Sequence, residues 1–265
     1  MKKISIVLPT YNEKANLEKF VMSVLGEQKK LPDYKIEIVI SDSHSKDGTD
    51  KIAKRLSDKY KNIHCIDVGP GIGVGLYEGH KYALKHIKPD ILMQLDADGQ
   101  VNHSVITKLT HVLEEGYTLA LGSRFVKGGK NELSFSRKIF TYASSYVCRI
   151  IMGPFDIAEF TNSARAFTPA LFKKINWKRL PWREKTFIML PAFLNEAVTS
   201  GAKYKEVPLI FSDRPSGYSK NKIFSYTYDL ITYAIDARLH KWGIDIPFFR
   251  FCLELKNLPK SIYFY

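Results

Sequence analysis

A pair of aspartates, Asp96 and Asp98, follows the apolar run 90–95 with one residue between them. Two carboxylates this close repel each other unless positive charge lies between them. Carboxylate oxygens suit a hard divalent cation, and such a cation commonly binds a substrate phosphate. A turn at Gly99 with both acids in solvent is the simplest alternative. The segment alone leaves metal binding and a solvated turn equally open.

Short apolar runs and helical patterns alternate through the first half of the chain. Strands are expected at 3–9, 36–40, 63–68, 90–95 and 117–121. Between them, apolar residues recur at the spacing of amphipathic helices, as in Leu17, Phe20, Val21 and Val24. This order of elements predicts an α/β fold with a mainly parallel sheet and right-handed crossovers.

The carboxyl ends of parallel strands meet at one edge of a sheet, where ligands bind. The polar turns 11–13, 42–43 and 96–98 follow the first, second and fourth predicted strands, so they are expected to share one crevice. This convergence favours a metal and phosphate site for the aspartate pair. The glycine-rich segment 71–75 has the wrong spacing for a dinucleotide fingerprint, and we expect a flexible turn at the crevice edge there.

The charge of the chain is uneven. Its 265 residues carry a formal net charge of +13, and residues 118–265 hold nearly all of the excess. A basic half favours anionic partners such as a lipid surface, nucleic acid or phosphorylated substrates, with a generally basic surface as the alternative. No nucleic-acid-binding motif is present, so nucleic acid ranks last among these partners.

The chain has no sequence feature of a secreted or membrane-spanning protein. Its three cysteines are far apart and odd in number, which favours free thiols in a reducing compartment. The apolar run at the N-terminus is too short for a signal peptide. No stretch offers the roughly 18 apolar residues that a spanning helix needs.

Several motifs, taken together, resemble family 2 glycosyltransferases of the GT-A fold, with the dolichyl- or polyprenyl-phosphate mannosyltransferases as the most similar subgroup. They occupy segments 6–13, 42–49, 90–100, 122–124, 136–138, 161–167 and 206–220. The resemblance implies a Rossmann-like, three-layer α/β fold with a mainly parallel central sheet, followed by C-terminal amphipathic helices. It divides the chain into a GT-A domain, 1–222, and an appendage, 223–265.

The resemblance also implies roles for individual residues. Asp96, Asp98 and Gln100 would hold Mg²⁺ or Mn²⁺ against the donor pyrophosphate. The nucleotide would be surrounded by Pro9, Tyr11, Glu13 and Asp42. Arg214 and Lys220 would lie on a loop over the donor phosphates, and the lipid phosphate of the acceptor would face Arg124, Arg137 and Thr141.

These roles predict an inverting hexosyltransferase, with mannose favoured over glucose as the transferred sugar. The donor would be a GDP- or UDP-hexose and the acceptor a polyprenyl phosphate. A phosphate acceptor is already ionised near neutral pH, since its second pKa is about 6, and needs no general base. A hydroxyl acceptor on a glycan or glycolipid would need one, for which Asp156 and Glu159 are the candidates. A catalytically weak membrane-bound subunit of a glycosylation complex is a further alternative.

The chain departs from the family pattern at four places that bear on specificity. Ser43 stands where the family usually has a second acid after Asp42, and the loop 69–75 lacks the usual nearby basic residue. Segment 161–165 lacks the usual Ser-Gly-Phe-Arg form, and 188–190 lacks the acid that is common after the Phe187 position. The first two departures leave the base, guanine or uracil, open. The last two leave the acceptor open.

Two aromatic-rich stretches favour a membrane surface. Residues 139–152 form an amphipathic pattern between Arg137 and Arg149, and a second pattern follows residue 222, with Phe224, Tyr228, Ile231, Ile235, Leu239 and Trp242. Aromatic residues mixed with lysine and arginine suit the headgroup layer. We therefore expect a cytoplasmic protein on the cytosolic face of a membrane, with a membrane partner subunit left open. Packing against the sheet domain or another subunit is the alternative.

Overall fold

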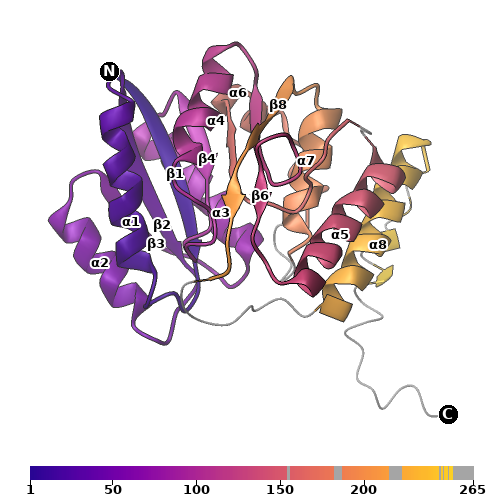
Figure 1. The fold of residues 1–265 in the computed structure, drawn as a ribbon, viewed down its shortest axis with the longest axis horizontal. Helices are drawn as coiled ribbons and strands as arrows, with labels where there is room; N and C mark the ends of the chain where they lie inside the picture. The colour runs from indigo at the N-terminus through magenta and orange to yellow at the C-terminus, as the bar shows by residue number, and fades with distance from the viewer. Residues whose placement is uncertain are drawn as a thin grey trace.

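The computed structural model describes residues 1–153, 156–181, 187–214, 223–244, 246, 248–249 and 251–252. A central sheet lies between helices on both of its faces, and helices α5 and α8 form one end of the molecule (Figure 1). This arrangement confirms the three-layer α/β fold.

The central sheet has seven strands in the order β3-β2-β1-β4-β7-β5-β8. They are β1 (Lys2–Thr10), β2 (Tyr34–Asp42), β3 (Ile63–Asp67), β4 (Ile91–Gln94), β5 (Leu119–Ser123), β7 (Arg165–Phe167) and β8 (Tyr204–Pro208). All neighbouring pairs are parallel except those of β7, which runs antiparallel to β4 and β5. The mainly parallel sheet is therefore confirmed. Strands β6 (Lys130–Asn131) and β9 (Ile210–Phe211) form a separate parallel pair.

Burial on both faces of the sheet follows from alternation along its strands. In β1, Ile4, Ile6 and Leu8 belong to one apolar cluster, whereas Val7 belongs to the other. The first cluster is covered by α1 (Leu17–Gly26), α2 (Thr49–Lys59) and α4 (Val105–Glu114). The second is covered by α3 (Ile72–Tyr82), α5 (Phe135–Met152), α6 (Pro169–Lys174), α7 (Met189–Thr199) and α8 (Ile223–Lys241). Side chains on a strand point alternately to its two faces, so a two-sided core needs apolar residues at nearly every position.

The glycine-rich segment is a turn only at its beginning. Gly71 has a φ of 118° and precedes α3, while Gly73 and Gly75 lie inside that helix. A Cβ on Gly75 would lie 3.1 Å from Cβ of Pro9, and one on Gly79 would lie 2.4 Å from Cγ1 of Val7. The expectation of a turn over 71–75 is thus wrong for 73–75, where the missing side chains let α3 approach β1 closely.

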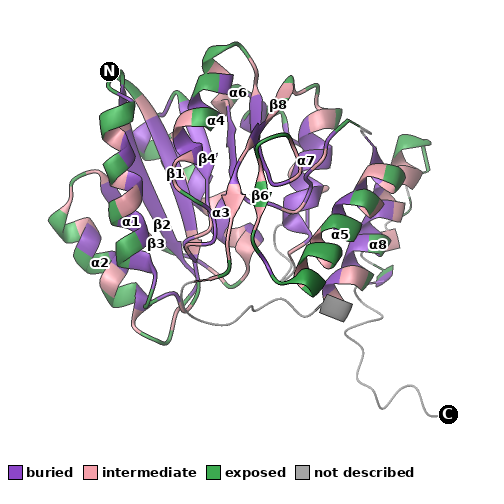
Figure 2. Ribbon diagram, in the orientation of Figure 1, coloured by how far each residue is buried: buried purple, intermediate pink, exposed green. Residues whose placement is uncertain are grey.

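Helix α8 packs against α5, and both helices carry exposed residues (Figure 2). Its buried residues include Tyr226, Leu230 and Tyr233, which belong to the second core cluster. The described aromatic and aliphatic residues left exposed on the two helices, or directly after α8 in the case of Trp242, are Phe135, Ile139, Tyr142, Tyr146, Ile150, Tyr228, Ile231 and Trp242. We call this set the α5–α8 apolar face. No helix within the described ranges is long and apolar enough to cross a membrane. The division at residue 222 stays a prediction.

Candidate active site

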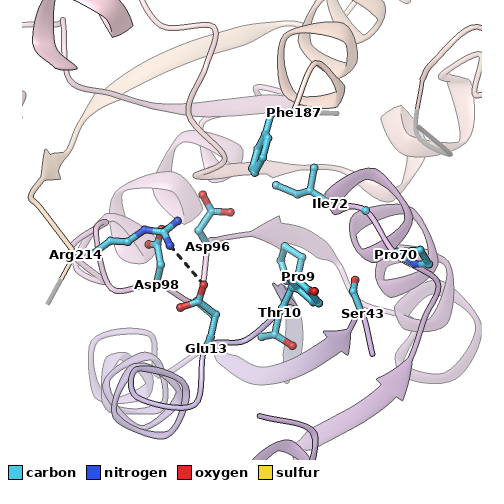
Figure 3. A pocket seen from close by; sticks show the side chains of 13 residues that line it. Pro9, Thr10, Glu13, Ser43, Pro70, Ile72, Asp96, Asp98, Phe187 and Arg214 are labelled. Carbon is cyan, nitrogen blue, oxygen red and sulfur yellow. Dashed lines mark ion pairs between the residues drawn. The ribbon is translucent and has the colours of Figure 1, made fainter. Parts of the chain in front are cut away.

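A cavity of about 410 Å³ opens at the carboxyl ends of β1 and β4. The end of β1 and the residues after it contribute Pro9, Thr10, Tyr11 and Glu13. The segment after β4 contributes Asp96, Ala97 and Asp98. Other loops and the first residue of α3 contribute Ser43, Pro70, Gly71, Ile72, Phe187 and Arg214. Figure 3 shows their side chains around the cavity. The turns that follow the first, second and fourth strands thus line one crevice.

Arg214 lies among the acids of this cavity. Its Nη2 is 2.9 Å from Oδ2 of Asp98, and its Nη1 is 3.6 Å from Oε1 of Glu13 (Figure 3). Its Nε donates a hydrogen bond of 3.2 Å to Oε1 of Gln100. Asp98 also accepts a hydrogen bond from the backbone N–H of Gln100. One guanidinium therefore joins three residues that the sequence placed around the donor and its cation.

The ionisation of Asp96 is altered by its surroundings. Burial, and after it the nearby charge of Asp98, raises the pKa of Asp96 to about 7. The charge of Arg214 opposes this rise in pKa without cancelling it. A carboxyl in this setting gains from an additional cation because the cation stabilises its ionised form.

The residues present fit a hard divalent cation that also binds substrate oxygens. Asp96, Asp98 and Gln100 offer only oxygen ligands, the donor set that Mg²⁺ and Mn²⁺ prefer. The described part of the chain contains no group of three or more Asp, Glu, His or Cys side chains placed to hold a metal. Two acids and an amide leave room for water and phosphate oxygens, as expected of a metal that binds together with its substrate.

Asp42 is held inside its own loop. Its carboxylate accepts hydrogen bonds from Oγ1 of Thr10 at 2.8 Å and from Oγ and the backbone N–H of Ser45 at 2.6 and 2.9 Å. Its neighbour Ser43 lines the cavity, whereas Asp42 is absent from the described lining residues. The predicted role of Asp42 beside the nucleotide therefore stays a prediction.

A second cavity, of about 230 Å³, shares Asp96 and Phe187 with the first. Arg124, Arg137 and Thr141, the three residues predicted to face the acceptor phosphate, all line it. They come from the segment after β5 and from α5. The three side chains therefore line one cavity, and their role toward an acceptor phosphate stays a prediction.

The two arginines of the second cavity are both paired with acids. Arg124 makes two hydrogen bonds of 2.7 Å to Glu159, and both side chains are buried. Nη2 of Arg124 also donates to Oγ1 of Thr161 at 3.0 Å. Nη1 of Arg137 lies 2.9 Å from Oδ1 of Asp213 in a half-exposed pair.

Neither acid considered as a general base is among the described residues that line these two cavities. Glu159 is engaged by Arg124, and Asp156 accepts hydrogen bonds from the hydroxyl of Tyr204 at 2.7 and 2.8 Å. A base must lie within hydrogen-bond reach of the proton it removes. The observed geometry therefore gives no support to a base-assisted hydroxyl acceptor.

Some site residues differ from the sequence expectation or lie beyond what the structure describes. Lys220 lies outside the described residues. Phe187, which lines both cavities, was given no role, because an apolar residue in a loop carries no spacing signal. Ser43 and Ile72 line the first cavity from the turn 42–43 and the segment 71–75, which were expected at the crevice.

Comparison with known proteins identifies relatives of this chain. The model of glycosyl transferase family 2 matches residues 5–182. A dolichol-phosphate mannosyltransferase of Pyrococcus furiosus is 30% identical over 92% of this chain, which spans 65% of that protein. The polyprenol monophosphomannose synthase of Mycolicibacterium smegmatis is 27% identical, over 81% of this chain and 79% of that protein.

Solved structures share the fold. Mannosyl-3-phosphoglycerate synthase from Rubrobacter xylanophilus has a TM-score of 0.62 and 16% identity, with 100% of this chain and 78% of that chain covered. The mannosyltransferase PcManGT from Pyrobaculum calidifontis, solved with GDP-mannose and Mn²⁺, has a TM-score of 0.52 and 17% identity, covering 98% of this chain and 77% of that chain. Likeness at this identity supports the three-layer fold.

Proposed function

The chain belongs to glycosyl transferase family 2, and we propose that it transfers mannose from a nucleotide sugar to a polyprenyl phosphate with inversion at the sugar carbon. The observation that carries this proposal is the pair of adjoining cavities, one with acids and one with arginines, that meet at Asp96 and Phe187. Two substrates held in adjoining cavities can react in one displacement. Relatives named as dolichol-phosphate and polyprenol mannosyltransferases support the choice of sugar and acceptor.

The larger cavity would hold the nucleotide sugar. Pro9, Tyr11 and Glu13 would lie beside the nucleotide, and Arg214 would neutralise its diphosphate. Asp96, Asp98 and Gln100 would hold Mg²⁺ or Mn²⁺. When bound, the cation supplies positive charge that stabilises the departing diphosphate. Arginine donors aimed at the same oxygens add to this stabilisation because charge grows there as the sugar leaves.

The smaller cavity would hold the phosphate of the acceptor. Arg137 would carry the main charge toward it, because its pair with Asp213 is half-exposed, whereas Glu159 balances the charge of Arg124 in a buried pair. The hydroxyl of Thr141 is an additional donor on the same wall. An ionised phosphate attacks without a general base, which agrees with the absence of Asp156 and Glu159 from the described lining.

The α5–α8 apolar face would bring the acceptor cavity to a lipid surface. Helix α5 carries both Arg137 and exposed residues such as Ile139 and Tyr146. Apolar side chains next to basic ones suit the boundary between headgroups and acyl chains. The chain would then work at the cytosolic face of a membrane, where its lipid substrate is held.

The test is transfer by the purified chain from radiolabelled GDP-mannose to a short polyprenyl phosphate in detergent, with Mn²⁺ or with EDTA. We expect labelled lipid with Mn²⁺ and none with EDTA. UDP-glucose serves as the competing donor, and the same polyprenol without its phosphate serves as the hydroxyl control. Transfer to polyprenol at an equal rate would refute a phosphate acceptor, and undiminished transfer in EDTA would refute the cation.

A further inference from the structure

The guanidinium of Arg214 occupies the space between the acids of the larger cavity. It lies 2.9 Å from Asp98, 3.6 Å from Glu13 and 3.2 Å from the side-chain oxygen of Gln100. Two of these contacts involve atoms that the proposed function assigns to a divalent cation. Arg214 and the cation therefore compete for the same oxygens.

Burial explains why a positive charge must stand there. The side chains of Asp98 and Glu13 are only 7% and 9% exposed, and that of Arg214 is 17% exposed. A buried carboxylate without a partner loses its hydration, and no other interaction compensates for the desolvation cost. In the chain without ligands, Arg214 supplies the compensating charge for Asp98 and Glu13.

We propose that Arg214 is an internal counter-ion, which fills the cation site of the unliganded chain and must leave it before a divalent cation binds. This inference rests on the proposed function. The donor diphosphate offers the displaced guanidinium a new anionic partner. Cation and nucleotide sugar therefore bind cooperatively, and the cation binds weakly when it is alone.

The backbone two residues before Arg214 is anchored by hydrogen bonds, which limits how the displaced arginine can move. The backbone N–H of Ser212 donates to the backbone oxygen of Gln100 at 2.9 Å, and the backbone oxygen of Ser212 accepts from Nε2 of Gln100 at 3.1 Å. Oγ of Ser212 also donates to Glu132. These contacts fix Ser212, so displacement of Arg214 leaves the backbone at Ser212 in place.

The experiment measures Mn²⁺ binding by electron paramagnetic resonance for the full chain, first alone and then with GDP. We expect Arg214→Gln to bind Mn²⁺ about tenfold more tightly than the unmodified chain when no nucleotide is present. Added GDP should tighten Mn²⁺ binding to the unmodified chain more than to this variant. Arg214→Lys, which keeps the charge, should stay closer to the unmodified chain.

A matched control removes a charge of the same kind elsewhere. Arg55 pairs with Glu18 on the surface, with its side chain 59% exposed, so Arg55→Gln should leave Mn²⁺ affinity unchanged. Thermal unfolding of each variant with and without Mn²⁺ checks that the fold persists. Equal Mn²⁺ affinity of Arg214→Gln and the unmodified chain would overturn this inference alone. Absence of Mn²⁺ binding in every variant, with GDP present, would overturn the cation site and this inference together.

Discussion

Arg137 and Asp213 form an ion pair, 2.9 Å from Nη1 to Oδ1, that joins α5 to the residue directly before Arg214. Arg137 lines the smaller cavity and Arg214 the larger one. Each arginine is thus paired with an acid of the chain itself. Acids of the chain therefore balance the positive charges of these two arginines at the places where the substrates are proposed to bind.

Asp213→Asn should free Arg137 for the acceptor. We expect the KM for polyprenyl phosphate to fall about twofold to threefold, because an exposed pair of this kind is worth less than about 1 kcal/mol. The KM for GDP-mannose should change little. Initial rates at varied acceptor concentration measure the effect, with Arg137→Gln, expected to raise the acceptor KM, as the opposing variant. A rise in acceptor KM for Asp213→Asn would contradict competition by its carboxylate.

Asp98→Asn should remove transfer while keeping the fold. The amide retains the shape of the side chain but loses the charge that Arg214 and the proposed cation share. We expect kcat to drop at least about 100-fold, the size of effect seen when one stabilising group is removed from an active site. Single-turnover transfer measures the loss, and circular dichroism checks the fold. A variant with near-normal kcat would refute a role for Asp98 in catalysis.

Glu159→Gln separates a structural acid from a catalytic one. Its carboxylate makes two hydrogen bonds to buried Arg124, so neutralising it leaves that arginine without its partner. Breaking a buried pair in this way costs about 3–5 kcal/mol. We expect the free energy of unfolding in urea to fall by this amount.

Asp156→Asn is the comparison for Glu159→Gln, because Asp156 bonds only a tyrosine hydroxyl near the surface in the contacts described here. It should change stability far less. If Glu159→Gln keeps the free energy of unfolding of the unmodified chain but loses transfer activity, Glu159 would instead be a general base.

The α5–α8 apolar face should control binding to lipid. Ile139 and Ile150 are 55% and 46% exposed on α5, and replacing both with glutamate adds charge without disturbing the core. We expect co-sedimentation with anionic vesicles to fall several-fold, while the melting temperature stays within a few degrees. Replacing exposed Met22 on α1 with glutamate is the control, since α1 lies in the other helical layer. Equal loss in both variants would point to general charge repulsion.

The sequence predicted strands β1 to β5 well because apolar runs and turns repeat there with clear periods. Strand β8, which pairs parallel with β5, was not predicted. Strand β7 was missed because three residues, Arg165–Phe167, show no period, and its antiparallel place between β4 and β5 depends on long-range pairing. Glycines 73 and 75 were read as a turn because sequence does not show the strand that α3 must approach. The acid-bearing turns converge as expected, since strand direction alone fixes that edge. The pairing of Arg214 with Asp98 depends on a contact across more than a hundred residues, which no local pattern encodes.

His80 should make the fold sensitive to acid. It is buried against Gln94 and the rings of Phe167 and Phe172, and burial lowers the pKa of this imidazole from 6.5 to about 3. The unfolded chain takes up the proton near pH 6.5 and the folded chain does not, so this contribution to stability is complete above pH 6.5. It is lost progressively as the pH falls toward about 3, at up to about 1.4 kcal/mol per pH unit.

Urea unfolding between pH 7.5 and 5 measures this slope, and His80→Gln, which has no proton to gain, should show a flatter dependence over the same range. The variant is expected to be less stable at pH 7.5 because its shape fits the aromatic pocket less well. The difference in stability between the two proteins should therefore narrow as the pH falls. If the free energies of unfolding of the two proteins depend on pH in parallel, His80 is protonated in the folded chain as readily as in the unfolded one.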